Sequence, residues 1–138
     1  MAEKVRDAMT SGPQTIEPGR PVAEAARIMK EADTGVVPVV DGDRLVGTIT
    51  DRDIVVRVIA DAKDPQSVMV DEVASRELVT IDPDQDLDEA LRLMAKHQVR
   101  RLPVVEEDGR LVGVLSQSDV AQEHDEAATG RMVKEISE

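Results

Sequence analysis

The stretch GRPVAEAARIMKEADTGVVPVV, from Gly19 to Val40, is repeated in outline by DQDLDEALRLMAKHQVRRLPVV, from Asp84 to Val105. The second stretch begins 65 positions after the first (84 − 19). After one inserted residue, GTITDRDIV from Gly47 matches GVLSQSDVA from Gly113, 66 positions later (113 − 47). A repeat of this length indicates two copies of one supersecondary unit. Any site built by one copy should therefore have a related version in the other.

Composition excludes several classes of protein. The chain has 138 residues, of which 41% are hydrophobic and 33% charged, as expected for a soluble globular fold. A net charge of −12 argues against nucleic acid as the main partner, and the lack of Phe, Tyr and Trp argues against base-stacking modules. The lack of Cys excludes disulfides and thiol nucleophiles. No apolar run approaches the roughly 20 residues of a membrane helix, and the first residues lack a signal-peptide core, so we expect a cytoplasmic protein and no membrane partner.

Each copy reads as strand, helix, strand, strand, helix, with the first strands at Gln14–Ile16 and Val79–Ile81. The helices carry apolar stripes at helical spacing, Val22, Ala25, Ala26 and Met29 in the first copy and Leu87, Ala90, Leu91 and Met94 in the second. Short β-branched runs follow, each joined by a turn to a second strand. We predict a mixed α/β fold of two βαββα repeats, packed through their sheets with pseudo-twofold symmetry. The predicted boundaries are 1–62 for repeat 1, 63–128 for repeat 2, and 129–138 for a C-terminal tail that could form a short helix.

The pattern Gly-x-x-Thr/Ser-x-x-Asp occurs in both copies, where a strand gives way to a helix: Gly47, Thr50, Asp53 and Gly113, Ser116, Asp119. One interpretation is a capping box, in which the hydroxyl and the carboxylate satisfy the first N–H groups of the helix. The other is a ligand site, since a helix N-terminus suits a phosphate and a carboxylate suits ribose hydroxyls. Spacing alone favours the cap.

The doubled pattern, with its h-P-V-V strands VVPVV and RLPVV and its Thr/Ser-x-x-Asp motifs, resembles the cystathionine-β-synthase (CBS) domain. Two copies in tandem resemble a CBS pair, or Bateman module, and TDRDIV with HQVRRLPVV is similar to the stand-alone hypoxic-response type. The resemblance covers Val5 to about Gln122. It implies adenosine ligands, AMP, ADP, ATP or S-adenosylmethionine, bound in two clefts, with no cofactor required.

Carried over residue by residue, the resemblance implies two sets of nucleotide-binding residues. The first set is Thr50, Arg52 and Asp53 with Val79, Val99 and Arg100. The second set is Ser116, Ser118 and Asp119 with Gln14, Thr15, Ile16, Thr34, Gly35, Arg100 and Arg101. The carboxylates would hold ribose hydroxyls, the hydroxyls ribose or phosphate, the guanidinium groups phosphate, and the strand backbone and valines the base.

The copies differ most in their arginines. Arg52 faces Ser118 in the alignment, and Arg100-Arg101 faces Gly35-Val36. These arginines are either solvated strand ends, as is usual for Arg, or an anion-binding feature, which the resemblance favours. His97 and His124 stand apart, with no second His or Cys nearby in sequence, so we expect no metal site.

No nucleophile constellation stands out, so we expect no enzyme. The functional hypothesis is a regulatory module that senses adenine nucleotides and changes its shape or its contacts with a protein it regulates. Two alternatives stay open: a stress or interaction protein that binds no nucleotide, and a subunit of an enzyme whose catalytic chain is separate. The resemblance also implies a homodimer through the helices after the two motifs, with Ile54, Val55 and Val58 as candidate contacts.

Overall fold

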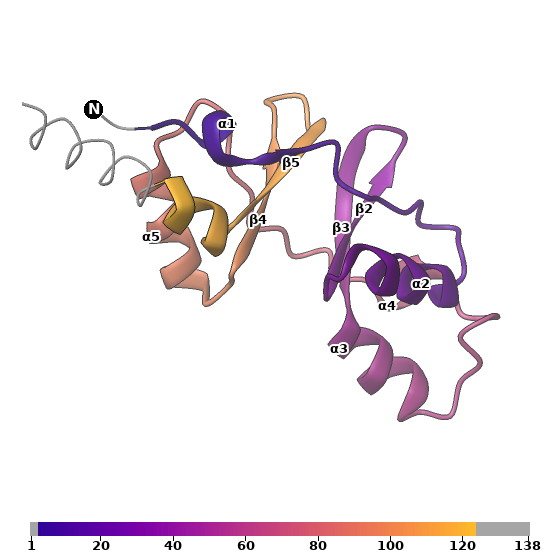
Figure 1. Ribbon diagram of the computed structural model, residues 1–138. Helices are drawn as coiled ribbons and strands as arrows, with labels where there is room; N and C mark the ends of the chain where they lie inside the picture. Colours follow the sequence, from indigo (N-terminus) through magenta and orange to yellow (C-terminus); the bar gives the residue numbers. More distant parts are fainter. Residues whose placement is uncertain (1–2, 124–138) are drawn as a thin grey trace, which may run out of the picture. The chain divides into compact units, whose positions relative to one another are not determined.

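The structure, a computed structural model, describes residues 3–123 and divides into two compact units (Figure 1). The first unit contains Pro13–Leu78 with Glu107–Leu111. The second unit, in its described part, contains residues 3–12, 79–106 and 112–123. The mixed α/β fold class predicted from the sequence is confirmed. The predicted tail at 129–138, like His124, lies outside the described residues.

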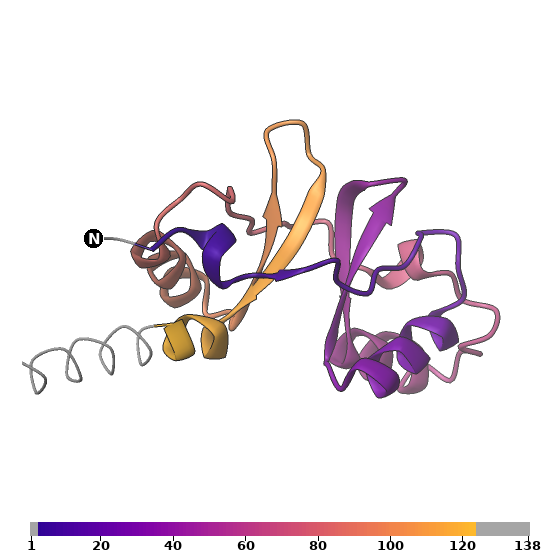
Figure 2. The ribbon, with the colours of Figure 1, turned by 45° about the horizontal axis from the view of Figure 1, so that its top comes forward.

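The first unit is built on one antiparallel hairpin. Strand β2 (Val36–Asp41) pairs with β3 (Arg44–Thr50), with a bulge between Val39 and Val40. The turn between them contains Gly42 at φ 67°, a left-handed conformation that glycine adopts without strain. Helices α2 (Val22–Ala32) and α3 (Asp51–Ile54) contact each other and the hairpin (Figure 2). Helix α3 continues as the π-helix η1 (Val55–Ile59), and α4 (Val70–Val73) completes the unit.

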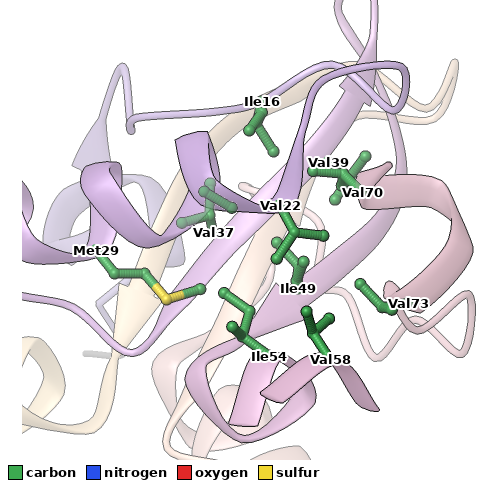
Figure 3. Packing of buried hydrophobic residues seen from close by; sticks show 11 residues of the cluster. Ile16, Val22, Met29, Val37, Val39, Ile49, Ile54, Val58, Val70 and Val73 are labelled. Atoms are coloured by element: carbon green, nitrogen blue, oxygen red, sulfur yellow. The ribbon is translucent and has the colours of Figure 1, made fainter. Parts of the chain in front are cut away.

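Aliphatic side chains alone form the core of the first unit (Figure 3). The predicted stripe on α2 buries Val22, Ala25 and Met29, whereas Ala26 is exposed. These side chains pack with Val37, Val39 and Ile49 of the hairpin, and with Ile54 and Val58 of the helix that follows. Burial of these apolar side chains stabilises the unit.

The second unit repeats this plan. Helix α5 (Leu87–His97) precedes β4 (Arg101–Val105) and β5 (Leu111–Ser116), and residues 117–123 are helical. The sheet order is β1-β5-β4, where β1 is Thr10–Ser11. On α5 an ion pair joins Arg92 to Glu89 at 2.6 Å; this hydrogen bond lowers the pKa of Glu89 and raises that of Arg92.

The first strand of each repeat is shorter than the sequence suggests. The predicted strand at 14–16 reduces to a parallel bridge from Ile16 to Val39, and the one at 79–81 to a bridge from Ile81 to Val104. In both copies a turn follows directly, at Glu17-Pro18 and at Asp82-Pro83, and proline offers no N–H to extend a ladder.

The segment that leads into each repeat packs on the other repeat. Helix α1 (Val5–Ala8) joins α5 in the second unit, where the Val5 N–H donates to the Gln85 carbonyl at 2.8 Å. In the first unit the Val70 N–H donates to the Arg20 carbonyl at 2.8 Å, which is the same contact 65 positions away. Arg6 also pairs with Asp84 at 2.6 Å, and this bond raises the pKa of Arg6. The compact units therefore do not coincide with the sequence repeats, because each unit contains the segment that precedes the other repeat. The repeat boundaries at 62 and 128 remain a prediction.

Candidate functional site

The first motif forms a complete capping box where β3 meets α3. The Thr50 hydroxyl oxygen accepts from the Asp53 N–H at 3.1 Å, and Asp53 Oδ2 accepts from the Thr50 N–H at 2.9 Å. Thr50 is extended, with φ −114° and ψ 162°, as an N-cap residue usually is. The capping interpretation of this motif is therefore confirmed.

The second motif forms the same pair of bonds at the end of β5. Ser116 Oγ accepts from the Asp119 N–H and Asp119 Oδ2 accepts from the Ser116 N–H, both at 3.0 Å. The Ser118 hydroxyl lies 3.0 Å from the Ser116 hydroxyl, so this copy gathers two hydroxyl groups. Arg52, which stands at the position of Ser118, makes no side-chain hydrogen bond to the residues that the structure describes.

Capping leaves part of each motif carboxylate available. A carboxylate has about four lone-pair sites, and the cap uses one oxygen, Oδ2, of Asp53 and of Asp119. Within residues 3–123, Oδ1 of neither residue accepts a hydrogen bond, and both side chains are only half-buried. The same aspartate can therefore hold its helix and accept a hydroxyl from a ligand.

In the first unit, the residues before β2 lie beside the first motif. The Gly35 carbonyl accepts from the Asp51 N–H at 2.9 Å, and the Thr34 hydroxyl lies 3.2 Å from the Val36 carbonyl oxygen. Ile16 is buried in the core, while Gln14 is exposed and Thr15 is half-buried. Thus Thr34 and Gly35 lie close to the start of α3, whereas Ile16 has a core role.

In the second unit, the backbone of Arg100 lies beside the second motif. The Arg100 carbonyl accepts from the Gln117 N–H at 2.7 Å, so the Arg100 backbone abuts the start of the helix. Arg101 opens β4 and is exposed, as Arg100 is. Val79 and Val99 are half-buried and pack against the core of the second unit.

The predicted site residues thus separate by unit. The first unit contains Gln14, Thr15, Ile16, Thr34, Gly35, Thr50, Arg52 and Asp53. The second contains Val79, Val99, Arg100, Arg101, Ser116, Ser118 and Asp119. Each predicted binding set draws on both groups, so the grouping into two sets remains a prediction. One neighbour of the first motif, Asp51, was missed; its replacement by the neutral Gln117 in the other copy could have revealed it.

The helix after the first motif has one buried and one exposed apolar side. Ile54 and Val58 belong to the core, so the prediction that they lie at a dimer contact is wrong; their i, i+4 spacing turns both inward. Val55, Val56 and Ile59 are 58%, 47% and 56% exposed. Elsewhere in residues 3–123, no cluster of His, Asp or Glu has metal-binding geometry, and no helix combines the length and apolar character of a membrane span.

A family model described as "CBS domain" matches residues 5–60 and again residues 70–126. The chain belongs to the CBS domain family. Among curated CBS relatives, YhcV of Bacillus subtilis is 44% identical over 117 residues, covering 85% of this chain and 82% of YhcV. Hypoxic response protein 1 of Mycobacterium tuberculosis is 38% identical over 132 residues, covering 95% and 92%.

Solved structures of CBS pairs share the fold. Hypoxic Response Protein I, crystallised with two coordinated zinc ions, is 37% identical with a TM-score of 0.80, covering 87% of this chain and 98% of that one. CBSX2 in complex with AMP is 25% identical, with a TM-score of 0.79 and coverage of 91% and 98%. The CBS pair of MJ0100, in complex with 5'-methylthioadenosine and S-adenosyl-L-methionine, is 26% identical, with a TM-score of 0.79 and coverage of 92% and 99%. The resemblance to a CBS pair seen in the sequence is confirmed.

Proposed function

We propose that this CBS pair is a regulatory module that binds an adenosine ligand, AMP, ADP, ATP or S-adenosylmethionine, through its two motifs. The observation that carries the proposal is the free Oδ1 of Asp53 and of Asp119, held in place by a cap that uses only Oδ2. A positioned carboxylate can accept charge-assisted hydrogen bonds from ribose hydroxyls. Two CBS pairs of the same fold are bound to AMP and to S-adenosylmethionine, which supports this class of ligand.

The other predicted residues supply the rest of the proposed contacts. The hydroxyls of Thr50, Ser116 and Ser118 reach ribose or phosphate, and the cations of Arg52, Arg100 and Arg101 reach phosphate. The base contacts backbone and aliphatic surface, which are contributed by residues 14–16, Thr34, Gly35, Val79 and Val99. Aliphatic surface must serve here because the chain has no aromatic side chain.

The proposed role is regulation rather than catalysis. A ligand changes the conformation of a regulatory module only if it binds one of two conformations more tightly than the other. Contact with a second chain can make two such conformations differ. We infer a homodimer in which the exposed Val55, Val56 and Ile59 contribute apolar surface. The proposal places the module in the cytoplasm, where nucleotide levels report the metabolic state.

Titration calorimetry with AMP, ATP and S-adenosylmethionine tests the proposal. Saturable heat from at least one of them, and none from guanosine monophosphate, is the expected result. No heat from any adenosine ligand would overturn the proposal. It would favour instead an interaction protein in which both motifs serve only as caps, a role that their complete capping boxes already allow.

A further inference from the structure

Asp51 carries a carboxylate that lies directly over Gly35. Its Oδ2 would stand 2.9 Å, and its Oδ1 3.3 Å, from a Cβ at position 35, so a side chain there would push the Asp51 carboxylate aside. The Asp51 N–H donates to the Gly35 carbonyl at 2.9 Å, and Asp51 Oδ1 accepts from the Arg52 N–H at 2.8 Å. Backbone and side chain together fix the negative charge of Asp51 at the start of α3.

The first motif therefore has no N–H group left for an anion. The N–H groups of Asp51, Arg52 and Asp53 donate to the Gly35 carbonyl, to Asp51 Oδ1 and to Thr50 Oγ1. A phosphate approaching this motif would have to displace the Asp51 carboxylate and would meet its charge. Asp51 is exposed, so water and salt weaken this repulsion, but like charges a few ångströms apart still repel each other.

The second motif differs at the corresponding positions. Gln117 stands where the first motif has Asp51 (51 + 66), and it is neutral. Arg100 stands where the first motif has Gly35, and its carbonyl accepts from the Gln117 N–H. The Ser118 N–H, which corresponds to that of Arg52, has no acceptor among residues 3–123.

The local charges differ in the same direction. Over positions 35, 36 and 51–53 the formal charge is −1, from Asp51, Arg52 and Asp53. Over the corresponding positions 100, 101 and 117–119 it is +1, from Arg100, Arg101 and Asp119. The two motifs are alike in their caps, and the sign of the charge differs once the residues at 35–36 and 100–101 are included.

We propose that Asp51 is a specificity-determining residue that keeps phosphate away from the first motif. The first motif then accepts adenosine ligands without a phosphate, and phosphorylated adenosine ligands bind at the second. This inference rests on the proposed function for its ligand class and narrows it: the phosphate contact proposed for Arg52 is then absent, and those of Arg100 and Arg101 remain. The exclusion of phosphate by Asp51 is testable without any adenosine ligand.

The experiment exchanges the two residues between motifs. Asp51→Gln copies the second motif into the first, Gln117→Asp does the reverse, and Asp51→Asn is a smaller change in case Asp51→Gln does not fold. Inorganic phosphate is titrated while the backbone amide signals of Arg52 and Ser118 are followed by ¹H–¹⁵N NMR. We expect phosphate to shift the Ser118 signal in the wild type, and the Arg52 signal only when Asp51 is replaced. Gln117→Asp should weaken the Ser118 response about tenfold or more.

An Arg52 signal that responds to phosphate equally in the wild type and in the Asp51 variants would overturn the inference, and so would no response in any of them. The same variants titrated with AMP and with adenosine address the proposed function separately. If the wild type binds neither, the proposed function fails, and the phosphate comparison still decides the role of Asp51. If both bind, Asp51→Gln should improve AMP binding at the first motif about tenfold while leaving adenosine binding there unchanged.

Discussion

Gly47 lies against the backbone of Ser75, so closely that a Cβ at position 47 would stand 2.7 Å from the Ser75 carbonyl oxygen. Gly113 has the same relationship with Thr10, whose carbonyl oxygen would stand 2.8 Å from its Cβ. In both contacts the second residue belongs to the segment that precedes one repeat and packs on the other repeat. The glycine of the Gly-x-x-Thr/Ser-x-x-Asp motif is therefore explained by the close passage of another backbone segment, and not by a left-handed backbone.

We predict that Gly47→Ala destabilises the protein by about 1–3 kcal/mol, because the added methyl group meets rigid backbone. Urea unfolding followed by far-ultraviolet circular dichroism measures the change. Gly19→Ala is the matched control, since no atom lies within 4 Å of its Cβ position. An equal effect of the two substitutions would contradict the account of Gly47.

The capping boxes predict a graded result at Thr50. Thr50→Ala removes the acceptor of the Asp53 N–H and should cost about 1 kcal/mol, whereas Thr50→Ser keeps an acceptor and should cost much less. The same unfolding experiment distinguishes them. Equal losses for the alanine and serine variants would mean that the hydroxyl does not stabilise the helix.

Because the segment before each repeat packs on the other repeat, a core substitution in that segment should destabilise the distant repeat. Val5 is fully buried among Ile81, Leu87 and Leu102 of the second unit. Val5→Ala should cost about 2 kcal/mol and should raise hydrogen exchange in α5 more than in α2. Val70→Ala is the counterpart and should affect α2 more. Faster hydrogen exchange in α2 alone after Val5→Ala would contradict the packing of the Val5 segment on the second repeat.

The helix that follows the first motif predicts opposite consequences for two isoleucines. Ile59 is 56% exposed, so Ile59→Lys should weaken self-association, seen by sedimentation, and leave unfolding unchanged within about 0.5 kcal/mol. Ile54 is 8% exposed, and Ile54→Ala should cost about 2–5 kcal/mol. A dimer that survives Ile59→Lys at the same concentration would rule out this face as the contact.

The sequence predicted the features that depend on residues close together in the chain, namely helices and their caps. The stripe of Val22, Ala25 and Met29 identified α2, and the spacing of Thr50 and Asp53 identified the cap, because both depend on neighbours within one or two turns. The alternation of faces in Ile54–Ile59 could also have been read from i, i+4 spacing, yet the sequence interpretation placed Ile54 and Val58 on the wrong side.

Non-local pairing was not predictable in this way. Nothing near Val5 in the sequence indicates that its N–H donates to the carbonyl of Gln85, 80 positions later (85 − 5). The role of Asp51 likewise depends on Gly35, which reaches it only through the pairing of β2 with β3. Aligning the two copies could have indicated this contact, because both of its residues differ in the second copy: Asp51 is replaced by Gln117 and Gly35 by Arg100.

The central claim is that Asp53 and Asp119 hold a ligand as well as a helix. Equilibrium dialysis of AMP and adenosine against the protein tests it most directly, because a chain without aromatic residues leaves near-ultraviolet absorbance to the ligand. The variants are Asp53→Asn and Asp119→Asn, alone and together, since the Asn oxygen can still accept the cap bond but lacks the charge. We predict that the wild type retains ligand and that the double variant binds about tenfold more weakly with unchanged circular dichroism. Retention of neither ligand by the wild type, or equal retention by the double variant, would contradict the claim.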